Sequence, residues 1–387
     1  MSRIVITCAR GIAPLLEGEV VSLGLPLVSA DSAGVVTEGT MDDAMRLNLS
    51  IRTGHHVLFL LADFVAENPE ELYLGVSQMA WEEYLESGGY ICVHSSVENR
   101  YIRDPRYANV KCKDAIVDRM SQRRGRRPDS GPERNRTVVF LYWKNGQCSL
   151  YLDTSGETLS RRGYRKIPLR APMQETLAAA VNLSAGWKGR GNYVNPMCGS
   201  GTLAIEAALM GLRRAPGLLR ENFGFMHVKG FQRAAWEDLR SRAIDASAGA
   251  LEGSIIATDH RREAVDAAMK NAAAAGVANF IEFRVCDYRD TPVPGGGGVV
   301  ILNPEYGERM GSPGELEGVY KGIGDFFKTR CSGYTGYLFT GNPDLAKKVG
   351  LRAKRKQQFF NGAIECRLLE YELYEGSRKD KKRQGER

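Results

Sequence analysis

The sequence has 387 residues, of which 43% are hydrophobic and 26% charged, and its formal net charge is +7. This length allows about two or three domains of ordinary size, and the composition excludes a chain that is disordered throughout. The longest apolar stretches, such as VLFLLADF at 57–64, are far shorter than the ~20 residues of a membrane helix, so we expect no membrane span.

The N-terminus and the cysteines indicate a reduced, cytoplasmic protein. MSRIVITCAR has no charged region followed by a long apolar core, so we interpret it as a first strand and not as a signal peptide. The eight cysteines stand singly, without a C-x-x-C pair or an adjoining histidine cluster, and the five histidines are dispersed. We therefore predict no metal site.

Residues 1 to about 155 alternate short strands with short amphipathic helices. Strands are predicted at RIVITCA, AGVVTEG and HHVLFLLADF, and helices at APLLEGEVVSLG and MDDAMRLNLSIRT. Asn145 and Gly146 separate the apolar runs RTVVFLYWK and QCSLYLDTS, which predicts a β-hairpin. This half of the chain is therefore expected to be α+β.

The positive charge is concentrated between residues 100 and 136. This segment has twelve basic and five acidic side chains, interleaves Tyr101 and Tyr107 with arginines, and contains a predicted short helix around Asp114 to Met120. Guanidinium groups bind phosphate in a forked geometry, so such a segment is typical of nucleic-acid binding. A solvated arginine-rich loop has the same composition.

Two further basic runs, RRGYRK at 161–166 and SRKDKKRQGER at 377–387, favour the nucleic-acid interpretation, although the tail alone is also typical of a disordered end. The candidate RNA-binding residues are Arg100, Arg103, Lys111, Lys113, Arg123, Arg124, Arg126 and Arg127.

From about residue 171 strands and helices alternate regularly. Strands are predicted at 192–197, 253–260, 280–288, 297–304 and 334–342, and helices at 171–186, 202–212, 262–276 and 314–330. This alternation predicts a parallel sheet with helices on both faces. Ligands of such sheets bind beyond the C-terminal ends of the strands.

Three of these strand ends have residues suited to a nucleoside. NPMCGSGT at 195–202 leads into a helix, and Gly199 and Gly201 let a ligand approach the backbone and the free N–H groups of the helix. Asp259 ends the second strand and can accept two hydrogen bonds from a ribose diol, and Asp287 ends the third, where it suits an adenine. The spacing matches neither a dinucleotide fingerprint nor a phosphate-binding P-loop, so S-adenosylmethionine fits better.

The fourth strand end is ILNPEYGERMG at 301–311. The side-chain oxygen of Asn303 and the carbonyl of Pro304 can grip the N–H groups of a base amine, and Tyr306 can stack on the base, so these three residues are the candidate catalytic residues. The alternative is a strand that ends at a proline beside a buried tyrosine.

Together with the linker RRGYRKIPLRAPMQETLAAA, the insert APGLLRENFGFMHVKGFQRAAWEDLR and the end KRKQQFFNGAIECRLLEYEL, these motifs resemble the bacterial THUMP-domain RNA guanine-N2 methyltransferases, which act on large-subunit ribosomal RNA. The resemblance is strong over about 160–375 and weaker upstream. It implies an α/β Rossmann-like class I methyltransferase domain at 159–376, preceded by an α+β RNA-binding region: a ferredoxin-like region at 1–50 and a THUMP-like domain at 51–158. Residues 377–387 would be a basic tail.

The resemblance also implies site roles. The cofactor-binding residues would be Asn195, Pro196, Cys198, Gly199, Gly201, Thr202, Asp259 and Asp287. Two positions depart from the family pattern, which usually has Asp in place of Asn195 and a second Pro in place of Glu305. Asn195 loses a charge that would pair with the cofactor's ammonium group, and Glu305 loses backbone rigidity.

The hypothesis is therefore an S-adenosylmethionine-dependent methyltransferase that flips a guanosine of 23S rRNA into its pocket. Three alternatives keep the chemistry and change the substrate to tRNA, another base amine or a protein amide, and the basic N-terminal half argues against the last. A further alternative is an RNA-binding assembly factor whose methyltransferase site has decayed.

Overall fold

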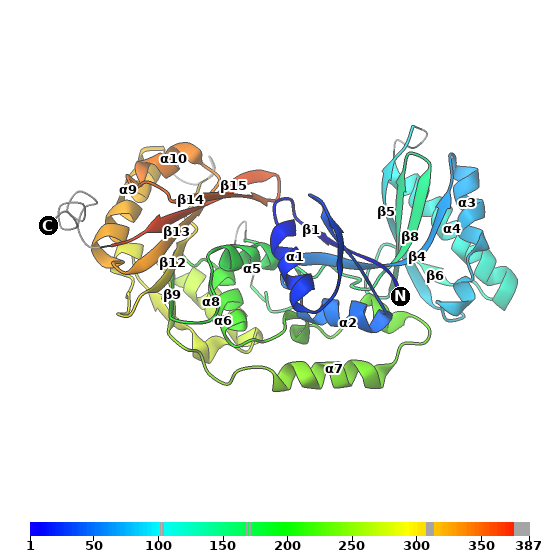
Figure 1. The fold of residues 1–387 in the computed structure, drawn as a ribbon, viewed down its shortest axis with the longest axis horizontal. Coiled ribbons are helices and arrows are strands. Elements are labelled where there is room, and N and C mark those ends of the chain that lie inside the picture. Colours follow the sequence, from blue (N-terminus) through cyan, green and yellow to red (C-terminus); the bar gives the residue numbers. More distant parts are fainter. Residues whose placement is uncertain (101, 103, 168, 170–171, 307–312, 375–387) are drawn as a thin grey trace. The chain divides into compact units, whose positions relative to one another are not determined.

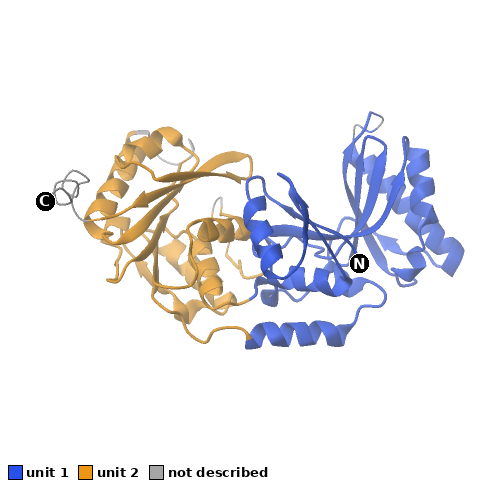
Figure 2. Cartoon of the chain, in the orientation of Figure 1, with its two compact units in different colours: residues 1–162, 215–245 blue, residues 163–214, 246–387 orange. Residues whose placement is uncertain are grey.

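The computed structural model describes residues 1–100, 102, 104–167, 169, 172–306 and 313–374. The chain forms two compact units, residues 1–162 with 215–245 and residues 163–214 with 246–387 (Figure 2). The predicted insert at 215–240 thus packs with unit 1, although it lies in sequence within the expected methyltransferase domain. The predicted domain boundaries at 50, 158 and 376 stay predictions.

Unit 1 is built on a sheet whose described strands have the order β2-β3-β1-β4-β8-β7-β5-β6 (Figure 1). They are β1 (Ser2–Cys8), β2 (Leu27–Ala30), β3 (Gly34–Gly39), β4 (Gly54–Val65), β5 (Tyr90–Glu98), β6 (Asp129–Ser130), β7 (Thr137–Lys144) and β8 (Gln147–Asp153). Strand β4 pairs antiparallel with β1 on one side and with β8 on the other, so it joins the two halves of the sheet.

The predicted hairpin at Asn145 and Gly146 is confirmed. Both residues have positive φ angles, 49° and 77°, and they connect β7 to β8. This conformation suits a two-residue turn between twisted antiparallel strands, and Asn and Gly are the residues that tolerate it best.

The helices of unit 1 are α1 (Ala13–Ser22), α2 (Met41–Ser50), α3 (Pro69–Gln78), α4 (Pro105–Arg124) and α7 (Arg233–Asp245), with 3₁₀ turns η1 (Trp81–Glu83), η2 (Pro216–Leu219) and η3 (Gly224–His227). The predicted short helix at 114–120 is wrong in its extent, because α4 has 20 residues. It begins where the Asp104 carboxylate accepts the N–H of Arg106 and ends at Gly125, whose φ is 66°.

One face of α4 is apolar and buried. Cys112, Ile116 and Met120 pack in a core with residues of α3, β5, β7 and β8, such as Trp143. Lysines and arginines between these positions obscure the apolar period in the sequence. The described part of the basic segment is therefore a packed helix at 105–124, followed by an exposed stretch that contains Arg126 and Arg127.

Unit 2 contains a sheet in which the described strands have the order β11-β10-β9-β12-β13-β15-β14. They are β9 (Asn192–Pro196), β10 (Ile255–Asp259), β11 (Glu282–Val285), β12 (Gly298–Leu302), β13 (Tyr334–Thr340), β14 (Arg355–Asn361) and β15 (Ile364–Glu372). The helices are α5 (Glu175–Ser184), α6 (Thr202–Gly211), α8 (Arg262–Ala274), α9 (Pro313–Arg330) and α10 (Pro343–Lys348), with 3₁₀ turns η4 (Ala278–Phe280) and η5 (Tyr288–Asp290).

The expectation of a wholly parallel sheet is wrong at one edge. Strands β9 to β13 are parallel, as predicted, but β15 pairs antiparallel with β13, and β14 pairs antiparallel with β15. A two-residue turn at Gly362 and Ala363 joins these last two strands directly, without a helix, and such a connection forces antiparallel pairing. This hairpin supplies one wall of the site described below.

The part of the chain that the structure describes contains no helix that is both long and apolar enough to cross a membrane.

Candidate active site

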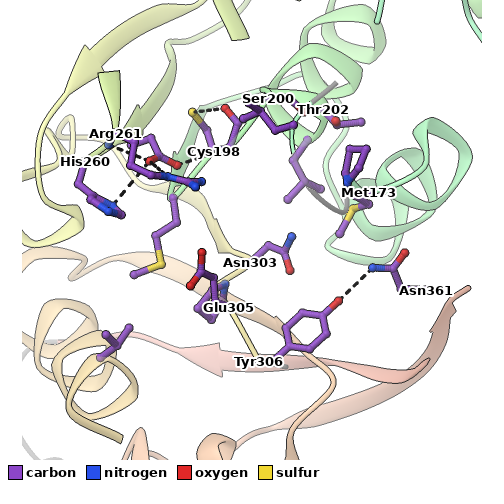
Figure 3. A pocket seen from close by; sticks show the side chains of 18 of the residues that line it. Met173, Cys198, Ser200, Thr202, His260, Arg261, Asn303, Glu305, Tyr306 and Asn361 are labelled. Carbon is purple, nitrogen blue, oxygen red and sulfur yellow. Dashed lines mark hydrogen bonds and ion pairs between the residues drawn. The ribbon is translucent and has the colours of Figure 1, made fainter. Parts of the chain in front are cut away.

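A cavity of about 750 Å³ lies at the C-terminal ends of the parallel strands of unit 2. Four neighbouring strands, β11, β10, β9 and β12, end at this edge of the sheet, so the polar strand ends predicted from the sequence are adjacent in space. Its lining residues include Met197, Cys198, Gly199, Ser200, Thr202, Asp259, Asn303, Pro304, Glu305 and Tyr306 (Figure 3).

The glycine turn connects β9 to α6. Gly199 and Gly201 have positive φ angles of 54° and 83°, and a Cβ at Gly201 would come within 2.8 Å of Ala268. Glycine is therefore required at 201 both by conformation and by space. Gly201 also occupies the N-cap position of α6 and offers no side-chain cap, so the first N–H groups of α6, at Thr202 and Leu203 on the cavity wall, are available to an anionic group.

Asp259 holds the glycine turn against β10. Its carboxylate accepts hydrogen bonds from the backbone N–H groups of Gly199 and Arg261, both at 3.0 Å, and its side chain is nearly buried. Arg261 Nε lies 3.5 Å and His260 Nδ1 3.6 Å from the same carboxylate. Asp259 thus orders the turn and still presents a carboxylate edge on the cavity wall.

The Asn303 corner follows β12 directly. The Oδ1 atom of Asn303 is buried and accepts no hydrogen bond within the described part of the chain. A buried amide oxygen without a partner costs free energy, on the order of 1–3 kcal/mol. Its position on the cavity wall indicates that a ligand supplies the missing donor.

Tyr306 is fixed by a different strand. Its hydroxyl accepts a hydrogen bond from Asn361 Nδ2 at 3.0 Å, at the end of β14 (Figure 3). Gly341 leaves room for the ring, because a Cβ there would come within 2.9 Å of Tyr306. Burial raises the pKa of Tyr306 well above its usual value, so the hydroxyl stays protonated at neutral pH.

Tyr320 supports the corner from α9. Its hydroxyl lies 3.4 Å from the carbonyl oxygen of Glu305, to which it donates, and 2.7 Å from Thr340 Oγ1. The backbone between Pro304 and Tyr306 is therefore held at its middle peptide, although the second proline of the family pattern is missing.

Asn195 is placed differently from expectation. It is fully buried within β9, is not among the residues that line the cavity, and donates from Nδ2 to the carbonyl of Ile301 on β12 at 2.9 Å. It ties β9 to β12 just before Asn303, and an aspartate could not donate this hydrogen bond when ionised. The amide is thus a link between strands, and its role toward a cofactor stays a prediction.

The remaining predicted cofactor residues divide into two groups. Cys198 and Thr202 line the cavity, and burial raises the pKa of the Cys198 thiol, which therefore stays protonated at neutral pH. Pro196 and Asp287 are not among the lining residues. Arg289 donates to the Asp287 carboxylate at 2.8 Å and lowers its pKa, so this carboxylate already has a partner.

Arg165 supports the site, although the sequence predicted it as part of a basic run. It donates to Glu175 Oε1 at 3.0 Å, to the Met173 carbonyl at 2.7 Å and to Ser200 Oγ, within the glycine turn, at 3.3 Å. Arg162 is buried as well and donates to the Leu159 carbonyl. The run RRGYRK is therefore only partly exposed: Arg161 and Lys166 lie on the surface, whereas the guanidinium groups of Arg162 and Arg165 bind carbonyl and carboxylate groups of the protein.

Other residues of the cavity wall also went unnoticed in the sequence. Leu316 and Val319 come from α9, and Asn361 and Ile364 come from the β14–β15 hairpin. Gly362, whose φ is 61°, lies in the turn of this hairpin, and a glycine between two apolar runs is a turn signal that was available in the sequence.

The candidate RNA-binding residues gather mainly at the C-terminal end of α4. Arg123, Arg124, Arg126 and Arg127 are exposed around Gly125, as is Arg100 after β5. Lys111 and Lys113 are partly buried and pair with Glu70 and Asp114. Arg103 lies outside the described residues.

Comparisons with known proteins agree with this architecture. Residues 162–370 match the family model of the RMKL-like methyltransferase domain, residues 3–58 the RlmL ferredoxin-like domain and residues 66–153 the THUMP domain. Unit 2 is therefore a methyltransferase domain of the Rossmann-like kind, and unit 1 carries ferredoxin-like and THUMP domains. The chain belongs to the RMKL-like methyltransferase family.

Among curated relatives, the ribosomal RNA large subunit methyltransferase K/L of Syntrophotalea carbinolica is 39% identical over 95% of this chain and 53% of its own length. The chain spans about half the length of this and similar K/L relatives. A putative RNA methyltransferase of Synechocystis is 33% identical and is covered over 96% of its length.

Two solved structures are similar to this chain. SMU.472, a putative methyltransferase complexed with SAH, superposes with a TM-score of 0.87 at 27% identity, over 97% of this chain and 98% of that one. A predicted N6-adenine-specific DNA methylase of Listeria monocytogenes superposes with a TM-score of 0.85 at 29% identity, over 96% of both chains. The names of these relatives differ in substrate, so the substrate must be argued from the site.

We predict that Asn195→Asp destabilises the protein more at pH 8 than at pH 5. An ionised carboxylate at this fully buried position would face the Ile301 carbonyl without a donor, and it becomes neutral only on taking up a proton. The buried environment would raise the folded-state pKa of the new carboxyl, so stability is lost as the pH rises through that pKa. We expect a loss of roughly 2–4 kcal/mol at pH 8, measured by urea unfolding. Unfolding free energies equal to those of the wild type at pH 8 would contradict the assigned hydrogen bond.

Proposed function

We propose that this protein is an S-adenosylmethionine-dependent RNA methyltransferase that methylates the N2 atom of a guanosine in large-subunit ribosomal RNA, in the cytoplasm. The observation that carries the proposal is the buried, unpartnered Oδ1 of Asn303 on the wall of a cavity that also contains a glycine turn and an acidic strand end. Such an acceptor requires a hydrogen-bond donor, and the exocyclic amine of a base supplies one.

The cofactor half of the cavity fits an amino-acid nucleoside. The N–H groups at the start of α6 would hold the carboxylate of the methionine part, and the Asp259 carboxylate would accept the ribose hydroxyls. Gly199 leaves open space, because a Cβ there would meet nothing within 4 Å. S-adenosylmethionine supplies, when bound, a methyl group on a positively charged sulfur.

The base half fits a planar amine. The Asn303 side-chain oxygen and the Pro304 carbonyl would accept the two N–H donors, which favours a pyramidal nitrogen with an available lone pair. Tyr306, fixed through Asn361, would stack on the base and hold the amine in line with the methyl group. The base must leave its RNA stack to reach this position.

Ribosomal RNA is favoured over other substrates by the relatives that are named as large-subunit rRNA methyltransferases and by the match to a THUMP domain. The exposed arginines around Gly125 would contact the phosphate backbone. A tRNA substrate remains the second candidate, and loss of all cofactor binding would favour the decayed assembly factor.

We predict that Asn303→Ala lowers methyl transfer at least a hundredfold and leaves RNA retention within about twofold of the wild type. Loss of an oriented acceptor at a reacting atom costs this much in other enzymes, roughly 10²–10³ in rate. The assay uses ribosomal RNA from a deletion strain, purified protein and nucleoside mass analysis for N2-methylguanosine. Asn361→Ala is the control that disturbs only the Tyr306 anchor, and we expect a smaller loss. Wild-type protein that methylates tRNA but not ribosomal RNA would contradict the substrate assignment.

We also predict that replacing Arg123, Arg124, Arg126 and Arg127 together by alanine weakens RNA binding and reduces its salt dependence. Each lost phosphate contact removes about 0.7–0.9 from the slope of log affinity against log salt concentration. Filter binding at several salt concentrations measures both effects. Arg106→Ala, at the opposite end of α4, is the matched control, since that arginine is paired with Asp104. An unchanged slope in the quadruple variant would show that RNA binds elsewhere.

A further inference from the structure

Glu305 is a carboxylate on the cavity wall that the base-gripping geometry does not use. Its side chain is exposed, and within the described part of the chain it makes no hydrogen bond or ion pair. Its backbone is nevertheless held, because Tyr320 donates to its carbonyl.

The other charges of the cavity wall largely offset each other. The Asp259 carboxylate accepts two backbone N–H groups and lies 3.5 Å from Arg261 Nε. Of the lining residues, Asp259 and Arg261 carry opposite charges, and Glu305 adds a carboxylate without a described cation. Asn195, at the neighbouring strand end, is uncharged, and its side-chain amide donates a hydrogen bond to the Ile301 carbonyl.

The direction of the Glu305 side chain indicates whether it faces the cofactor or the base. In Figure 3 the Glu305 carboxylate points to the side of Arg261 and His260, at the end of β10, whereas Tyr306 and Asn361 lie on the other side of Asn303. Glu305 therefore faces the half of the cavity that fits the cofactor, and the base would lie on the Tyr306 side.

The cofactor and its product differ in charge at one atom. S-adenosylmethionine has a sulfonium, an ammonium and a carboxylate, and its net charge is positive. Transfer of the methyl group leaves both electrons of the broken S–C bond on sulfur, so S-adenosylhomocysteine has a neutral thioether and no net charge. A carboxylate close to the sulfur attracts the first ligand and is indifferent to the second.

We propose that Glu305 is a specificity-determining residue that recognises the sulfonium charge, so that the cavity prefers S-adenosylmethionine to S-adenosylhomocysteine. The inference rests on the proposed use of this cofactor and is independent of the RNA substrate. The consequence is faster release of S-adenosylhomocysteine after the reaction, because this product lacks the sulfonium charge through which Glu305 attracts S-adenosylmethionine.

The test is the ratio of the two dissociation constants, measured by titration calorimetry on the full-length protein without RNA. We expect Glu305→Gln to lower the preference for S-adenosylmethionine about fivefold, the size expected of a partly exposed charge pair. Glu305→Asp should retain part of the preference. The difference between wild type and Glu305→Gln should shrink at high ionic strength, because salt screens an exposed charge.

Glu372→Gln is the matched control, because Glu372 is an exposed residue of β15 that does not line the cavity. It should leave the ratio unchanged. Glu305→Gln that weakens both ligands equally, or neither, overturns the inference while cofactor use stands. Wild-type protein that binds neither ligand overturns the proposed cofactor use, and the inference with it.

Discussion

The pairing of β10, β9 and β12 in one parallel direction is the constraint on which the site depends. It places three strand ends at the same edge of the sheet, and two hydrogen bonds between strand ends fix them there. Gly199 donates to Asp259 across β9 and β10, and Asn195 donates to Ile301 across β9 and β12. The glycine turn, the acidic strand end and the Asn303 corner are thereby held in one cavity.

Polar satisfaction distinguishes the parts that hold the site from the parts that act in it. Arg165, Asn195, Tyr320 and Asn361 each use their donors on protein atoms, so they are supports. The Oδ1 atoms of Asn195 and Asn303 are both buried without a described partner, but of these two residues only Asn303 lines the cavity, and Glu305 presents an exposed carboxylate to it. The buried, unpaired Asn303 oxygen raises the free energy of the empty site, and a ligand that supplies a donor compensates this cost.

The sequence predicted the order of the strand ends well, because apolar runs that end in Gly, Asp or Asn-Pro are local signals. It predicted α4 poorly, because lysines and arginines on the exposed face hide the period of Cys112, Ile116 and Met120. The inward direction of Arg162 and Arg165 was also missed, since composition does not tell a solvated guanidinium from one that caps carbonyl groups. The β14–β15 hairpin was missed although Gly362 marks its turn. Asn361 contributes to the site by donating a hydrogen bond to the Tyr306 hydroxyl. The two residues are 55 positions apart in the sequence, so no local pattern predicts this contact.

The most direct measurement is a crystal structure of the protein with S-adenosylhomocysteine and a guanosine-containing RNA fragment of its substrate. The account predicts that the N2 atom of the flipped guanine lies within hydrogen-bonding distance of both Asn303 Oδ1 and the Pro304 carbonyl, with the base stacked on Tyr306. A base whose amine points away from Asn303, with the Oδ1 atom bound to water or to the protein instead, would contradict it.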